Sequence, residues 1–71
     1  MSDTPPQETY ISTHLWCSLQ RFQAIHRGMP IGPSRTTMLL ALSDAHRMGK
    51  NPTHIFDGDS HKWTTIAETT A

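Results

Sequence analysis

The sequence is poor in cysteine, and Cys17 is the only one. A lone cysteine cannot form an intramolecular disulfide, which excludes the disulfide-stapled domains of many small secreted proteins. The sequence also lacks any apolar run close to the ~20 residues that a membrane-spanning helix needs. Its first residues, MSDTPPQE, have neither the basic start nor the apolar stretch of a signal peptide. We therefore expect a soluble, cytoplasmic protein that does not enter a membrane.

An excess of charge is absent as well. Six basic and six acidic side chains cancel, which argues against a non-specific binder of polyanions. The distribution is uneven, because residues 21–50 contain five Lys or Arg side chains against Asp44 alone. A chain of 71 residues supports one small domain, residues 1–71, that buries only ~60% of its unfolded surface. We therefore expect a partner subunit or a metal to add stability.

Residues 5–27 carry a pattern that predicts a first helix. Thr4 can cap it, prolines are tolerated in the first turn, and Gln7 has capping-box spacing. Gly28 is a typical helix stop. An apolar stripe at helical spacing runs through Ile11, Leu15, Leu19, Phe22 and Ile25.

The segment GMPIGP, residues 28–33, has two glycines and two prolines and predicts a turn. A second helix is expected over residues 33–48, ending before Gly49. Its apolar face is wide, because Leu39 and Leu40 point to different sides. Ala41 and Ala45, one turn apart, would let a neighbouring helix approach closely.

The segments THIF and HKWTTI have the β-branched and aromatic content of strands, and DGDS between them is rich in turn formers. We therefore predict a β-hairpin over residues 53–66, with Gly58 at positive φ, followed by a polar tail over residues 67–71. The fold class expected is α+β: two antiparallel helices joined by a Pro/Gly turn, followed by a short β-hairpin.

No complete metal or catalytic signature is present. His14 and Cys17 lie three residues apart, and His54 and His61 could add zinc ligands, but the paired spacing of a zinc finger is missing. A nucleophilic thiol would also need an aligned base, an oxyanion site and a substrate pocket, for which a short chain has little room. We predict no metal, no cofactor, no small-molecule substrate and no enzymatic activity.

The run Ser34-Arg35-Thr36-Thr37, followed by Ala41-Leu42, Gly49 and a hairpin, resembles the recognition helix and wing of winged helix-turn-helix DNA-binding proteins. Short polar and arginine side chains at a helix N-terminus contact phosphates and base edges in that family. The resemblance implies a DNA-binding transcriptional regulator. Its DNA-contacting residues would be Ser34, Arg35, Thr36, Thr37, Arg27 and Lys50.

The favoured function is different. Small, neutral chains with little cysteine resemble the accessory and inhibitory proteins of phages and other mobile elements, which implies a non-enzymatic regulator that binds a host protein. We expect a homodimer through the second helix, since a second copy would cover its surplus apolar surface. The residues predicted to bind partners are Leu39, Leu40, Trp16 and Arg47.

Overall fold

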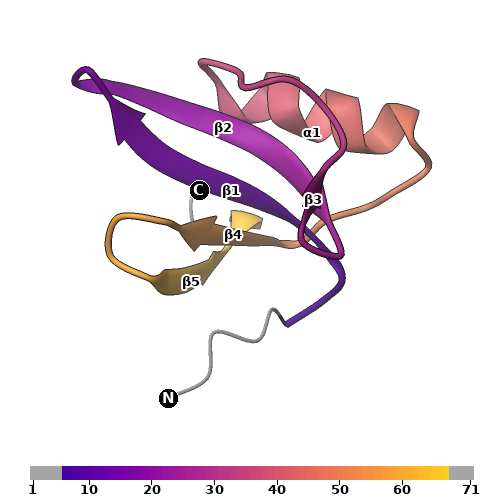
Figure 1. Cartoon of the computed structure of the whole chain (residues 1–71). Helices are drawn as coiled ribbons and strands as arrows, with labels where there is room; N and C mark the ends of the chain where they lie inside the picture. Colours follow the sequence, from indigo (N-terminus) through magenta and orange to yellow (C-terminus); the bar gives the residue numbers. More distant parts are fainter. Residues whose placement is uncertain (1–5, 68–71) are drawn as a thin grey trace.

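The computed structural model describes residues 6–67, which form a mixed sheet with one helix (Figure 1). The sheet has five strands in the order β3-β2-β1-β4-β5. The predicted pair of helices is therefore wrong, because most of the predicted first helix forms strands. The elements are β1 (Thr9–Trp16), β2 (Leu19–His26), β3 (Met29–Pro30), α1 (Met38–Arg47), β4 (His54–Asp57) and β5 (Lys62–Thr65).

An antiparallel hairpin of β1 and β2 replaces the predicted helix over residues 5–27. The strands pair from Thr9 opposite His26 to Trp16 opposite Leu19. The connecting turn is only Cys17 and Ser18, with φ of 52° and 68°, as in the two-residue hairpin turns that match strand twist. The segment TYISTHLW is rich in β-branched and aromatic residues, which favour a pleated strand over a helix.

Gly28 lies in the turn after β2 and does not end a helix. Arg27 and Gly28 have φ of 53° and 80° and form a second tight turn, after which β3 pairs with the end of β2. The predicted turn between helices over residues 28–33 is therefore in part an edge strand. Phe22 and Arg35 exchange both backbone hydrogen bonds, at 2.7 and 2.6 Å, so the chain stays beside β2 until shortly before α1.

Helix α1 begins at Met38 and not at residue 33 as predicted. Thr37 is its N-cap, with extended backbone and a side chain that accepts a hydrogen bond from the Leu40 N–H. The backbone pairing of Arg35 with Phe22 keeps the preceding segment out of the helix. The predicted helix end is confirmed, because Gly49 follows the last turn with φ of 76°.

The crossover through α1 makes β4 parallel to β1 and puts the helix on one face of the sheet, mainly over β2 (Figure 1). Ala41 and Ala45 are fully buried there, so they let α1 approach its own sheet and cannot serve the close approach of a second copy. The buried core consists of Ile11, Ala24, Ala41, Ala45 and Ile55.

A partly buried ion pair ties the segment before α1 to the helix. Arg35 donates from Nε to Oδ2 of Asp44 and from Nη2 to Oδ1, both at 2.9 Å. Gly32 lies close to the Asp44 side chain. A Cβ at Gly32 would be only 2.9 Å from the Asp44 Cβ, so a larger residue would not fit there without a shift. These hydrogen bonds lower the pKa of Asp44 below its ordinary value.

The predicted hairpin is confirmed by the antiparallel pairing of β4 with β5. Gly58 was wrongly predicted at positive φ, a conformation that His61 adopts in this turn. The Asp57 carboxylate accepts hydrogen bonds from the Asp59 and Ser60 N–H groups, which lowers its pKa. Of the predicted polar tail, residues 68–71 lie outside the described residues.

Candidate protein-interaction site

The outer end of the β1–β2 hairpin, residues 14–21, is here called the arm. It stands clear of α1 (Figure 1). Trp16 is 65% exposed, and Leu15 and Leu19 are exposed to a similar degree. Large apolar side chains that gather on one exposed feature mark interaction sites more reliably than scattered ones.

The arm is held in place from the β4–β5 turn. The Gly58 N–H donates to the Thr13 carbonyl at 2.8 Å, and the Leu15 N–H donates to Oδ2 of Asp59 at 2.9 Å. Gln20 on β2 also donates to the Thr13 hydroxyl across the strands. Because backbone and side chains brace it, the arm presents its apolar residues in a fixed geometry.

A first hollow lies beside the arm on the face that carries α1. Its volume is about 310 Å³, and it is lined in part by Phe22, Ile55, Asp57 and Lys62. Phe22 and Ile55 belong to or pack against the core, so the hollow has an apolar floor and a rim with one charge of each sign.

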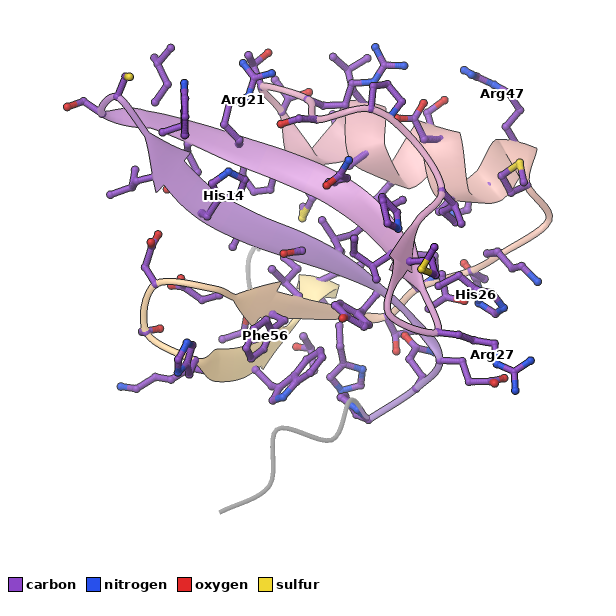
Figure 2. All side chains as sticks on the ribbon, viewed as in Figure 1. His14, Arg21, His26, Arg27, Arg47 and Phe56 are labelled. Atoms are coloured by element: carbon purple, nitrogen blue, oxygen red, sulfur yellow. The ribbon has the colours of Figure 1, made fainter. Side chains whose placement is uncertain are left out.

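A second hollow of about 340 Å³ is lined by His14, Trp16, Arg21 and Ser34. His14 and Arg21 face each other across the hairpin. The Arg21 guanidinium donates from Nε to the Ser34 hydroxyl at 3.0 Å and from Nη2 to the Ser34 carbonyl at 3.2 Å. Figure 2 shows the labelled Arg21 reaching from β2 toward the segment before α1. We call this hollow the Arg21 pocket.

Aromatic rings cover the sheet face opposite α1. Trp63 lies 4.9 Å from Tyr10 and 4.7 Å from Phe56 between ring centroids, and His61 stacks on Phe56. The Trp63 Nε1–H is buried and has no hydrogen-bond partner within residues 6–67. Tyr10, Phe56 and Trp63 are half-buried and pack on one another, so we assign the cluster to stability and not to the interaction site.

The four residues predicted to bind partners fall in two places. Trp16 lies on the arm, whereas Leu39, Leu40 and Arg47 lie on α1. Leu39 and Leu40 are exposed, and Arg47 Nη1 lies 3.7 Å from Oδ1 of Asp44. The predicted homodimer through this helix stays a prediction, with Leu39 and Leu40 as its apolar surface.

The DNA-contact residues predicted from the helix-turn-helix resemblance do not form a recognition helix. Ser34, Arg35, Thr36 and Thr37 all precede α1. Arg27 pairs with Glu8 at 3.0 Å. The backbone N–H of Lys50 donates to the Ala45 carbonyl at the end of α1.

The candidate metal ligands are not brought together. His14 lines the Arg21 pocket, Cys17 lies in the hairpin turn, and the Nδ1 of His54 lies 2.9 Å from the Thr53 hydroxyl. Within residues 6–67, no group of three or more His, Cys, Asp or Glu side chains could hold a metal ion.

Leu15, Leu19 and Arg21 were missed as site residues because the leucines were assigned to a helical core stripe. The signal that could have found them is the symmetry around Cys17-Ser18, where Leu-Trp precedes and Leu follows the two turn residues. In a hairpin this places apolar side chains at the closed end, farthest from the rest of the sheet.

No helix within residues 6–67 is long and apolar enough to cross a membrane. Comparisons of the chain with protein-family models, with curated proteins and with solved structures found no match. The candidate site is therefore supported by the geometry of this structure alone.

Proposed function

We propose that this protein is a small, non-enzymatic regulator or inhibitor that acts by binding a host protein through the arm. The observation that carries the proposal is the exposure of Leu15, Trp16 and Leu19 together at the end of a braced hairpin. Tryptophan is enriched among the few residues that dominate protein-binding energy.

The geometry of the arm suits binding because little has to be ordered on association. Ordering flexible side chains and loops on binding costs free energy. In a preformed hairpin the backbone is already ordered before the partner binds. The turn at Cys17 and Ser18 and the hydrogen bond from Leu15 to Asp59 hold the apolar tip. Trp16 and Leu19 are register partners and share one face of the hairpin, with Leu15 on the other face. A partner with a matching apolar groove would bury Trp16 and Leu19.

A protein target is better supported than DNA. Non-specific phosphate binding needs several free cations on one side, yet Arg35 is engaged by Asp44 and Arg27 by Glu8. The exposed thiol of Cys17 on the proposed contact surface suits a reducing compartment, so we propose that the protein acts in the cytoplasm.

Trp16→Ala should weaken partner binding by ~30-fold or more, since truncation of a central tryptophan typically costs at least ~2 kcal/mol of binding. The tagged protein would be purified from its native cell and bound proteins quantified, with dissociation constants then measured on purified partners. The fold should survive, because Trp16 is largely exposed.

Two matched variants make this measurement specific. Met48→Ala removes a comparably exposed apolar side chain and should leave partner binding unchanged. Leu39→Ala with Leu40→Ala would disturb the proposed dimer and not the arm. Equal partner binding by wild type and Trp16→Ala would refute the proposal, and tight DNA binding that weakens steeply with salt would favour the nucleic-acid alternative.

A further inference from the structure

We infer that the Arg21 pocket receives the carboxylate of an Asp or Glu side chain of the bound protein. This inference rests on the proposed function, and it adds the chemistry of the partner: an acidic side chain next to the apolar residues that cover Trp16. The pocket and the apolar tip share Trp16, so one partner segment can occupy both.

The first argument is charge. The pocket is lined by a guanidinium, an imidazole, an indole and a hydroxyl, with no acidic side chain among its lining residues. A guanidinium has five N–H donors in a planar fork. Those of Arg21 reach only Ser34 within residues 6–67, and the remaining donors match the paired oxygens of a carboxylate.

The second argument is preorganisation. Two hydrogen bonds to Ser34 hold the Arg21 guanidinium in the pocket, so a ligand need not order a free side chain. His14, directly opposite on β1, adds a ring N–H that can donate to an anion. Trp16 supplies an apolar wall for the carbon stem of a glutamate or aspartate.

The third argument separates a carboxylate from a nucleic-acid phosphate. Nucleic acids are bound by several cations along the backbone, whereas Arg21 is the only Lys or Arg among the described residues that line the pocket. The nearest alternatives in sequence, Arg27 and Arg35, are in ion pairs with Glu8 and Asp44. A single preorganised arginine suits one acidic side chain of a protein.

The test uses two neutral-capped peptides, acetyl-Leu-Glu-Leu-amide and acetyl-Leu-Gln-Leu-amide, titrated into the full-length ¹⁵N-labelled protein. The Trp16 indole N–H and the Arg21 Nε–H report the pocket directly in NMR spectra. We expect both signals to shift, with the Glu peptide bound at least ~5-fold more tightly, because a charge-assisted hydrogen bond is roughly twice as strong as a neutral one.

Arg21→Gln should abolish the preference for Glu, whereas Arg47→Gln, which changes an exposed arginine on α1, should keep it. If Arg21→Gln fails to fold, Ser34→Ala provides the second variant, because it releases the Nε hydrogen bond and should reduce the preference without removing the charge.

Three results would overturn the inference: equal affinity for the two peptides, a preference for Glu that survives Arg21→Gln, or no shift with either peptide at millimolar concentration. If a thymidine oligonucleotide shifts the same two signals and binds with higher affinity than the Glu peptide, the pocket would be assigned to phosphate instead. Equal affinity of the wild-type protein for the two peptides, together with partner binding that depends on Trp16, would remove this inference alone. Partner binding insensitive to Trp16→Ala, with the Glu preference of the wild type intact, would remove the proposed function and leave the Arg21 pocket as a carboxylate site without an assigned partner.

Discussion

Ile11→Ala should lower the free energy of unfolding by about 4 kcal/mol, a loss large enough to leave the domain barely folded. Ile11 is fully buried between α1 and the sheet, and truncation of such a side chain removes its burial and leaves a cavity. A chain of this length is stabilised by only roughly 4–10 kcal/mol. Urea unfolding followed by circular dichroism would measure the change.

Leu15→Ala is the matched control on the same strand. Its side chain is 56% exposed, so we expect a loss of less than about 1 kcal/mol. A continuous helix over residues 5–27 would place both residues in one buried stripe and make the two losses similar. Similar losses would therefore contradict the projecting hairpin.

Asp44→Asn should lower the melting temperature by about 5 °C or more, because it removes a buried carboxylate that accepts two hydrogen bonds from the partly exposed Arg35 guanidinium. Asp44 is 3% exposed and meets the Arg35 guanidinium at 2.9 Å. Glu8→Gln is the matched control, since it breaks an ion pair at 3.0 Å whose side chains are both mostly exposed. Such surface pairs contribute little. Equal melting temperatures for the two variants would contradict the conclusion that the Asp44–Arg35 ion pair stabilises the fold.

The same pair predicts a dependence of stability on pH. The Arg35 hydrogen bonds hold the pKa of Asp44 below its ordinary value of 3.8, so the unfolded chain takes up this proton at a higher pH than the folded protein does. The contribution of Asp44 is therefore complete well above pH 4 and falls as pH drops toward the lowered folded pKa. Thermal melts should show the difference between wild type and Asp44→Asn shrinking below about pH 4. A difference that stays constant there would contradict this.

Local chemistry made the second half of the chain partly predictable. The turn formers DGDS sit between two segments of strand-forming residues, and β4 and β5 fall within the predicted hairpin. Gly49 correctly marked the end of α1. The start of α1 was misplaced because Pro33 and Thr37 both suit a helix start, and the backbone pairing of Arg35 with Phe22, a long-range contact, decides between them.

The first half was mispredicted because its apolar residues fit two periods. Ile11, Leu15 and Leu19 lie four apart, which suits a helix face, but the even spacing of Ile11 and Leu15 also puts them on one face of a strand. The turn carries Cys17 and Ser18 in place of the usual Asn-Gly, so no local signal broke the apparent helix. Of the interaction site, only Trp16 was foreseen, since the arm exists only in the hairpin.

Photo-cross-linking from position 16 tests the central claim, that the arm is where the partner binds. Trp16 would be replaced by benzoylphenylalanine and the protein irradiated in its native cell. The matched control places the same group at Met48, which is similarly exposed. We predict that one protein is cross-linked strongly from position 16 and weakly or not at all from position 48. Cross-linking from position 48 alone, or from position 16 to nucleic acid, would contradict the arm as the protein-binding site.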